Sequence, residues 1–501
     1  MPRLLLLVCA LLLLSTTAVP GADPTPPRWV GSPHGAQQEE VLAWARREFA
    51  EEPASPAALD RAFPKWVKQY AALHSAIVQR RAPAAAQRFV VWRCSASKRC
   101  SGWGNRVTGL VSALAFAVLS DRALVIEWPD AGALALENLV KSDVIDWRVP
   151  EWLAHRSTPY SHDSTLIIDR VFGPGMELTR RFKLLNPAYH LERAVWIQAS
   201  QGFLPAMWQN PALDDAFCAL SLGHIDDAVS LLSRMLFRPA GDVEHLVAAL
   251  KREAGGRPII ALQLRFTEVS TLTVADMPRF YAAATHMEEG YAAGGQEGVW
   301  VLATDSPAVA AAALSGPYGH KIAWLNASIG HQDDCKDGAC AVKLFADYFL
   351  VNAAHGAVIS GGSTYGLMAR LARFQDATQD TTQIKDTSQD KRGYPWRLLA
   401  IMDCGDRPRK PPYGGKGSCG CREDLDYWDC GVEDTCFDGT FGCMLLEQRQ
   451  CHDFHFDVDR CPPSDANTER GDTPLSDPES SWGPGDWLRW DVEDMHWDAI
   501  R

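Results

Sequence analysis

Short apolar runs alternate with segments of helical spacing through the middle of the chain. Residues 89–92 and 123–128 are almost entirely apolar, and residues 107–119 between them repeat apolar positions at three-to-four spacing. A buried strand, a glycine-containing loop, a helix and a second buried strand form one βαβ unit of a parallel sheet. We therefore expect an α/β domain to begin near Arg88.

The same alternation returns after residue 257 and continues for about 150 residues. The pattern predicts strands at 258–265, 299–303, 321–325 and 356–360, and helices at 276–290, from Val309, at 344–354 and at 364–374. Such alternation is typical of an open, doubly wound sheet, whose ligands bind at the carboxyl ends of the strands. Two domains of this kind predict a cleft between them, lined by residues that directly follow the strands.

The start of the chain matches a secretory signal. One positive charge precedes the apolar run 4–14, and small residues follow near Ala18 and Ala22. A spanning helix needs about 20 apolar residues, so a cleaved signal peptide at 1–22 is favoured over an uncleaved membrane anchor. Residues 23–36 are rich in proline and glycine, and helical spacing follows to Gln87. We expect a linker and helical stem over 23–87.

Cysteine use agrees with an oxidising compartment. Apart from Cys9 there are 13 cysteines, and the last eight fall within residues 404–461. This spacing predicts a small module held by disulfides, since its own core is too small. Because 13 is odd, at least one thiol is free or paired between chains. The acidic, tryptophan-containing segment 462–501 follows as a tail.

The charge of the chain is concentrated at its end. The whole sequence has 49 Lys and Arg against 62 Asp and Glu, a difference of −13, and residues 401–501 alone hold 10 against 23, also −13. The first 400 residues therefore sum to zero. With no basic excess to follow a phosphate backbone, we expect no nucleic-acid partner.

Four polar segments follow predicted strands. Residues 102–106 open the first helix, where glycines allow a ligand to come close. Arg265 ends an apolar strand, so it is either paired structurally or directed at a phosphate pair. Asp305 either caps the next helix or accepts hydrogen bonds from a base or ribose. Residues 360–366 combine two glycines with hydroxyls at a helix start, as a phosphate cradle does, but lack a P-loop lysine. Together these segments indicate a nucleotide diphosphate held between two Rossmann-like halves.

These motifs resemble the fucosyltransferases of the two-Rossmann GT-B architecture, the xyloglucan and plant-type enzymes and their Nod-factor, N-glycan core and protein O-fucosyltransferase relatives. The resemblance rests on residues 102–106, 119–128, 263–265, 303–306 and 346–366, and covers about 88–400. It implies an α/β fold with an acceptor-side domain at 88–240 and a domain at 241–403 that binds a GDP-sugar. Two departures stand out: Gln263 replaces a histidine seen in several relatives, and the Gly-Asp that often follows the arginine is absent.

The resemblance also implies residue roles. Arg265 would bind the diphosphate and stabilise the departing GDP; Asp305 would lie near guanine or ribose. The donor-binding set it implies is Gly104, Asn105, Arg106, Arg265, Asp305, Ser363, Thr364 and Tyr365. An acceptor hydroxyl also needs a group to take its proton, and the candidates are Glu127, at the end of a strand, and Glu268, just beyond Arg265.

Metal-dependent chemistry is less well supported by the sequence. The Asp-X-Asp pairs at 424–426 and 457–459 lie in the acidic, cysteine-rich segment rather than after a strand of a nucleotide-binding domain. Disulfides are likewise favoured over zinc for the cysteines and histidines at 451–461. We expect no metal and no cofactor besides the donor substrate, GDP-fucose.

The sequence thus predicts an inverting, metal-independent fucosyltransferase of the Golgi lumen or Golgi membrane, or a secreted one, that transfers L-fucose from GDP-β-L-fucose to a glycan hydroxyl. The alternatives are a GT-B transferase that uses another sugar nucleotide and a non-catalytic secreted glycan-binding protein with the same fold. The partners implied are GDP-fucose and a glycan acceptor, with a membrane only if the first segment is an anchor. The sequence does not indicate an oligomeric state.

Overall fold

The computed structural model describes the central part of the chain and a few short segments beyond it. The described residues are 63–94, 101–130, 132–154, 163–171, 178–199, 202–208, 210–220, 222, 225–266, 273–291, 297–325, 327, 335, 337–360, 363–372, 397–401, 420–422 and 427–429. All of them lie in one compact unit, Met1–Cys461. The expected signal peptide, most of the stem and the acidic tail lie outside the described residues, as does almost all of the cysteine-rich module.

The N-terminal half is built on a four-stranded parallel sheet. Its strands are β1 (Phe89–Arg93), β2 (Ala123–Glu127), β4 (Ser164–Ile167) and β5 (Ala194–Gln198), in the order β2-β1-β5-β4. The two strands predicted from sequence are confirmed, and β4 and β5 are additional. In β1 and β2 four consecutive residues are buried, because helices cover both faces of a parallel sheet.

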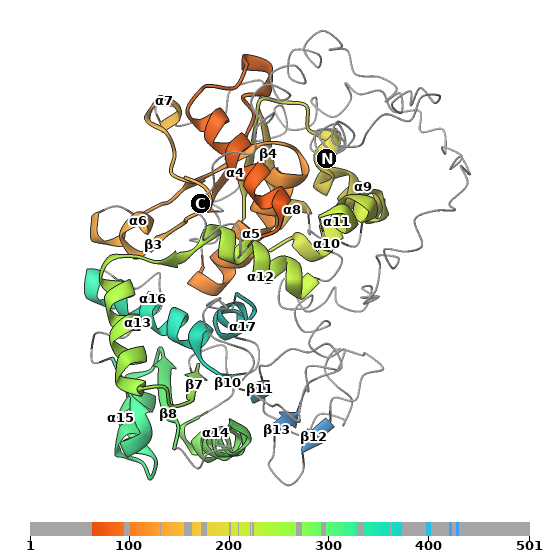
Figure 1. Cartoon of the computed structure of the whole chain (residues 1–501). Coiled ribbons are helices and arrows are strands. Elements are labelled where there is room, and N and C mark those ends of the chain that lie inside the picture. Colours follow the sequence, from red (N-terminus) through yellow and green to blue (C-terminus); the bar gives the residue numbers. More distant parts are fainter. Residues whose placement is uncertain are drawn as a thin grey trace, which may run out of the picture. The chain divides into compact units, whose positions relative to one another are not determined.

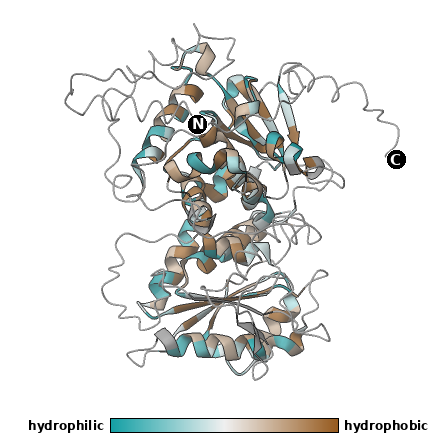
Figure 2. Ribbon diagram, turned by 90° about the vertical axis from the view of Figure 1, so that its right-hand side faces the viewer, coloured by the Kyte–Doolittle hydropathy of each residue, from teal (hydrophilic) through white to brown (hydrophobic). Residues whose placement is uncertain are grey.

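The C-terminal half contains the second parallel sheet. Its strands are β7 (Ile259–Leu264), β8 (Val299–Thr304), β9 (Ile322–Ala323), β10 (Gly356–Ser360) and β11 (Arg397–Ile401), in the order β11-β10-β7-β8-β9. Figure 2 shows its apolar strands in brown between helices that carry polar residues. Four predicted strands are confirmed, although the one at 321–325 is only two residues long. Two parallel sheets confirm the predicted α/β class.

Helices surround the sheets, and most of the predicted ones are present. They are α4 (Lys65–Val78), α5 (Trp103–Leu119), α6 (Leu136–Leu139), α7 (Glu151–Ala154), α8 (Ile168–Val171), α9 (Leu178–Leu185), α10 (Leu204–Trp208), α11 (Asp214–Ala219), α12 (Ile225–Leu236), α13 (Gly241–Ala254), α14 (Met277–Tyr291), α15 (Pro307–Ser315), α16 (Gly338–Ala353) and α17 (Thr364–Leu371). Short 3₁₀ turns are η1 (Ala84–Ala86), η2 (Gly132–Leu134), η3 (Pro187–Tyr189), η4 (Pro211–Leu213), η5 (Val274–Asp276) and η6 (Gly319–Lys321). Two small antiparallel pairs complete the elements, β3 (Val140–Lys141) with β6 (Arg238–Pro239) and β12 (Gly420–Arg422) with β13 (Tyr427–Asp429).

Two helices begin earlier than predicted. The helix α5 starts at Trp103 rather than Val107, so Asn105 and Arg106 lie in its first turn and not in a loop. The helix α16 starts at Gly338, because the Asp337 carboxylate accepts a hydrogen bond from the Cys340 N–H at 2.8 Å and caps the helix. As a result, Asn105 and Arg106 lie on a helix rather than in a loop, and Lys343 lies within α16.

The two halves share one hydrophobic core. The helix α5 of the N-terminal half contacts α17, and both lie near α16 (Figure 1). The buried Trp103 ring lies 4.4 Å from that of Phe345 on α16 and 5.1 Å from that of Phe237, measured between ring centroids. Aromatic contacts of this kind add about 0.5–1.5 kcal/mol beyond the burial of area. The interface between the halves is thus packed as an interior.

Candidate functional site

A cavity of about 720 Å³, including its open mouth, lies where the two halves meet. It is lined by the loop and first turn of α5, the ends of β7 and β8, one side of α16 and the start of α17. The lining residues are Ser101, Gly102, Trp103, Gly104, Asn105, Gln263, Arg265, Ala303, Thr304, Asp305, Cys340, Lys343, Leu344, Asp347, Thr364 and Tyr365. The cavity therefore includes residues from all four segments predicted from the sequence.

Arg265 lies at the end of β7 and is fixed through its backbone. Its N–H donates to the Ser360 hydroxyl oxygen at 2.8 Å, which ties the end of β7 to the end of β10. Its Nε lies 3.7 Å from Oδ2 of Asp305, and about a quarter of the Arg265 side chain is exposed. The pair is loose for a hydrogen bond, so the guanidinium fork stays available at the cavity.

Asp305 is not the cap of the following helix. The Ser306 hydroxyl accepts from the Val309 N–H at 3.4 Å and caps α15 instead. The Asp305 carboxylate lies at the cavity beside Arg265. That it accepts hydrogen bonds from a base or ribose stays a prediction.

The start of α17 supplies backbone and side-chain groups to the cavity. Ser363 is buried and caps the helix, accepting from the Gly366 N–H, whereas Thr364 and Tyr365 line the cavity. The Tyr365 hydroxyl donates to the Leu344 carbonyl at 2.6 Å. Burial raises the pKa of Tyr365 well above its ordinary value, and the nearby Asp347 carboxylate acts in the same direction. Tyr365 is thus a neutral positioning group that joins α17 to α16.

Gly104 is needed for the contact between the two halves. A Cβ added there would overlap the backbone N of Tyr365 and lie 2.6 Å from its Cα. The absence of a side chain lets α5 come directly against α17. This glycine was expected to admit a ligand, and the structure shows that it admits the backbone of the other predicted motif.

The two polar residues after Gly104 differ in their placement. Asn105 lines the cavity, and its amide donates to the Ser101 hydroxyl at 2.7 Å. Arg106 does not line it: its Nε donates to the Ser101 carbonyl at 2.9 Å, and its guanidinium lies 4.7 Å from the Trp128 ring centroid. It also approaches Asp130 at 3.5 Å. Arg106 thus holds the loop before α5 in shape.

Of the two candidates for the base, the structure describes only Glu127, which is not among the cavity residues. Glu127 is exposed at the end of β2, where it lies opposite Arg93 in the register of β1 and β2. Glu268 lies outside the described residues.

Sequence reasoning missed a buried charged pair in the cavity wall. Lys343 and Asp347 lie one turn apart on α16, are 2% and 4% exposed, and are joined by a hydrogen bond from Nζ to Oδ2. Burial raises the pKa of Asp347 to about 6, although the Lys343 ammonium acts in the opposite direction. The signal was present as two charges at i,i+4 spacing within a helix that is otherwise largely apolar.

Gln263 and Asp347 each have a buried acceptor atom with no hydrogen-bond partner among the described residues. These atoms are Oε1 of Gln263 and Oδ1 of Asp347. The Gln263 side chain lies over the first turn of α17, where a Cβ on Gly366 would be 2.6 Å from Oε1. A buried acceptor without a partner costs about 1–3 kcal/mol. This cost is recovered when a ligand supplies N–H or O–H donors.

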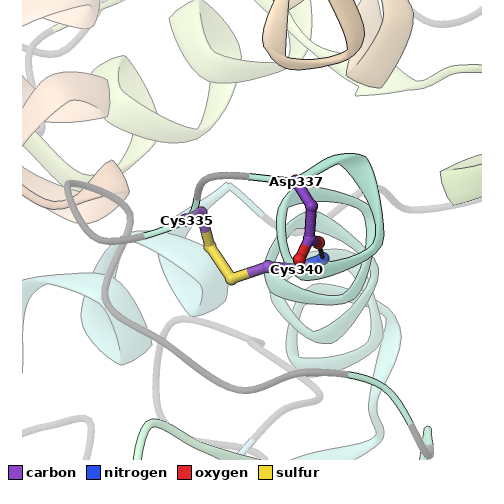
Figure 3. The surroundings of a disulfide bond; sticks show 3 residues. All are labelled: Cys335, Asp337 and Cys340. Carbon is purple, nitrogen blue, oxygen red and sulfur yellow. Dashed lines mark hydrogen bonds between the residues drawn. A yellow bond between two sulfur atoms is a disulfide. The ribbon is translucent and has the colours of Figure 1, made fainter.

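A disulfide borders the cavity beside the first turn of α16. Cys335 and Cys340 are joined, and Figure 3 shows the bond beside Asp337. Cys94 and Cys218 are also disulfide-bonded. The predicted use of cysteines in disulfides is therefore confirmed at these positions. The cysteines of 404–461 lie outside the described residues, except Cys421.

Two features are absent from the described part of the chain, a metal-binding cluster and a membrane-spanning helix. There, no group of three or more His, Cys, Asp or Glu side chains could hold a metal ion. Within the same residues no helix has the length and apolar character needed to cross a bilayer. The Asp-X-Asp pairs at 424–426 and 457–459 lie outside this part.

Comparison with known proteins finds likeness only at the level of solved structures. No family model and no curated relative matches. A point mutant of Arabidopsis thaliana FUT1 in complex with GDP is 16% identical, with a TM-score of 0.48 over 76% of this chain and 88% of that chain. The fucosyltransferase NodZ from Bradyrhizobium is 15% identical, with a TM-score of 0.37 over 56% and 92%. POFUT1 in complex with GDP-fucose is 11% identical, with a TM-score of 0.34 over 57% and 94%. At such identities and TM-scores the activity has to be argued from the cavity.

Proposed function

We propose that the protein is an inverting fucosyltransferase that transfers L-fucose from GDP-β-L-fucose to a hydroxyl of a glycan or glycoprotein in the secretory pathway. One observation carries the proposal: Arg265 lines the same cavity as Thr364 and Tyr365 at the start of α17. A guanidinium fork and the free N–H groups of a helix start are the two protein features best suited to a diphosphate.

The chemistry of transfer explains why these groups matter. The acceptor oxygen forms a bond to C1 of the sugar while the bond from C1 to the β-phosphate oxygen breaks, and the electron pair leaves with GDP. Negative charge therefore grows on the diphosphate, where preorganised donors lower the barrier most. The acceptor proton passes to a carboxylate. For this role we keep Glu268, since it follows Arg265 in sequence, ahead of the exposed Glu127.

The unpaired acceptors of the cavity favour guanine as the base. Guanine presents adjacent N–H donors on its Watson–Crick edge, whereas uracil presents one. Oδ1 of Asp347 and Oε1 of Gln263 are acceptors in need of donors. A site built from buried acceptors rejects ligands that leave them unpaired, by as much as about 10⁴-fold. In this proposal Asp305 lies near the ribose or base, and Asn105 faces the sugar.

A panel of sugar nucleotides tests the proposal on the full-length protein. Calorimetry should show tighter binding of GDP than of UDP, ADP or CDP, and GDP-fucose should release GDP when a mixture of glycan acceptors is added. Transfer from a different sugar nucleotide would support a GT-B enzyme with another donor. Binding of glycans without binding of any nucleotide would support the non-catalytic alternative and would overturn the proposal.

A further inference from the structure

The Lys343 ammonium lies in the cavity wall and has no role in the proposed transfer. Its Nζ donates to Oδ2 of Asp347 and lies 3.7 Å from the centroid of the Trp324 ring. Both charged side chains are almost fully buried on α16. A buried ion pair is weak evidence for stability, because desolvation offsets most of the attraction. The pair therefore needs an explanation other than stability.

The Lys343 ammonium favours the ionised form of the Asp347 carboxyl, which burial alone would disfavour. Burial favours the neutral carboxyl and raises its pKa to about 6, while the Lys343 ammonium lowers that pKa by attraction and by hydrogen bonding. The other titratable groups near the carboxylate are Tyr348 on α16, Tyr365 on α17 and, across the cavity, Arg265 and Asp305. Both tyrosines stay neutral, because burial raises their pKa values. Lys343 is thus the cation that acts directly on Asp347.

The hydrogen bond from Lys343 also makes the two carboxylate oxygens of Asp347 different from each other. Oδ2 is taken by Lys343, and Oδ1 has no hydrogen-bond partner among the described residues. An ionised carboxylate only accepts hydrogen bonds, whereas a protonated one carries a donor that opposes the N–H groups of a base. A neutral carboxyl keeps an acceptor oxygen, but a weaker one, and its O–H can face the base. The protonation state of Asp347 therefore sets how strongly Oδ1 accepts from a nucleobase.

We propose that Lys343 is a positioning residue for donor recognition: it holds Asp347 as an oriented carboxylate, so that Oδ1 accepts from an N–H donor of the bound nucleobase. This inference rests on the proposed function, because it takes a guanine nucleotide as the ligand. Lys343 acts through Asp347 and does not itself contact the base.

The test compares Lys343→Met, Lys343→Arg and Asp347→Asn in the full-length protein, with the Kd for GDP measured by calorimetry as a function of pH. Without the ammonium, the pKa of Asp347 rises further and the group is largely neutral near pH 7. The Kd for GDP should then rise about 10-fold or more in Lys343→Met. The loss should shrink as the pH is raised, because Asp347 then ionises again. Lys343→Arg should restore most of the affinity, and KM for the donor should change more than kcat.

A matched control removes another lysine of the same kind. Lys321 pairs with the buried Glu288 at 3.1 Å and lies 5.4 Å from the Trp300 ring centroid, but it does not line the cavity. Lys321→Met should leave the Kd for GDP unchanged. The double variant Lys343→Met with Asp347→Asn should bind GDP no more weakly than Asp347→Asn alone, because the lysine acts only through the carboxylate.

The outcomes separate this inference from the proposed function. If the unaltered protein binds no guanine nucleotide, the proposed function fails. If it binds GDP and Lys343→Met binds equally well, only the inference fails. A loss that does not vary with pH and persists in the double variant would make Lys343 a direct phosphate ligand, which also overturns the inference. If Lys343→Met does not fold, the other two single variants decide: the inference then requires that Asp347→Asn weaken GDP binding and that Lys343→Arg preserve it.

Discussion

The sheets of the two halves resemble each other where their strands begin, because a buried arginine donates to backbone carbonyls there. They differ in the residues at which their strands end. Before β2, the buried Arg122 donates to the carbonyls of His190 at 2.6 Å and Glu192 at 2.7 Å, which precede β5. In the other half, the buried Arg370 donates to the Ala354 carbonyl at 2.7 Å, just before β10. Each arginine donates to carbonyls at the beginning of a strand, and buried carbonyls need such donors.

At the carboxyl ends the similarity stops. The C-terminal sheet ends in Gln263, Arg265 and Asp305, and all three line the cavity. The N-terminal sheet ends in Arg93, Glu127 and Gln198, which lie opposite one another in the strand register and do not line it. The N-terminal half reaches the cavity through the start of α5 instead. Two domains with the same βα pattern thus contribute different elements to the cavity. A polar residue that follows a strand therefore cannot be assigned to the cavity from its position alone.

The strongest test of this difference compares the two arginines that end equivalent strands. Arg265→Ala should lower kcat/KM for the donor by about 100- to 1,000-fold, because it removes a preorganised donor from the leaving group. Arg93→Ala removes a guanidinium that lies 5.0 Å from the Trp196 ring centroid, and it should leave the Kd for GDP unchanged. Steady-state kinetics and calorimetry check both. Equal losses in the two variants would show that both sheets serve the donor.

Sequence patterns located the C-terminal contribution to the site because it is encoded locally. The strand β7 is entirely buried and Arg265 follows it, so a polar residue after an apolar run was sufficient to place Arg265 at the cavity. Thr364 and Tyr365 were found in the same way, at a helix start after β10. Both patterns can be read from residues that are adjacent in the sequence, without knowledge of the tertiary structure.

The remaining parts of the site depend on packing between distant segments. Which side of α16 faces the cavity is decided by its contacts with α13 and α17, and the sequence of one helix does not show that Lys343 and Asp347 lie on that side. The partner of Gly104 is Tyr365, far along the chain. The strands β4 and β5 were missed although β5 is as long as β1, and β5 pairs with β1 from a position about 100 residues further along the chain. Arg106 shows the converse, since this polar residue of the same motif lies over the Trp128 ring and does not line the cavity.

The two halves also differ in how a buried titratable group makes the stability of the fold depend on pH. In the N-terminal half His74 is buried and donates from Nε2 to the Leu124 carbonyl at 2.8 Å, and burial lowers its pKa to about 4. The folded state thus resists protonating His74, so its contribution to stability is full above pH 6.5 and is lost as the pH falls through about 4. Asp347 in the C-terminal half has the opposite sign: its raised pKa favours the folded state at low pH, and that contribution is lost as the pH rises through about 6.

The variant His74→Gln keeps a side-chain donor for Leu124 but does not titrate. Because one pKa unit corresponds to about 1.4 kcal/mol, the unaltered protein should lose roughly 3 kcal/mol of unfolding free energy through His74 between neutral pH and about pH 4. Urea unfolding at several pH values should show a smaller loss in His74→Gln than in the unaltered protein. The readout is the slope with pH, so a general destabilisation by the substitution does not obscure it. Parallel slopes would contradict the assignment.

The smallest effect concerns the point where the halves touch. Gly104→Ala would normally stabilise a helix by about 0.5–1 kcal/mol, but here the new Cβ overlaps the Tyr365 backbone, which cannot rotate away. We expect a net loss of about 1–3 kcal/mol in unfolding free energy, as for other overpacked interiors, together with weaker binding of GDP because the start of α17 is displaced. Gly132→Ala is the control: its glycine has φ +63° and open space around it, so backbone strain should lower stability without changing the Kd for GDP. If Gly104→Ala raised stability and bound GDP normally, α5 and α17 would not be in the contact that joins the two halves.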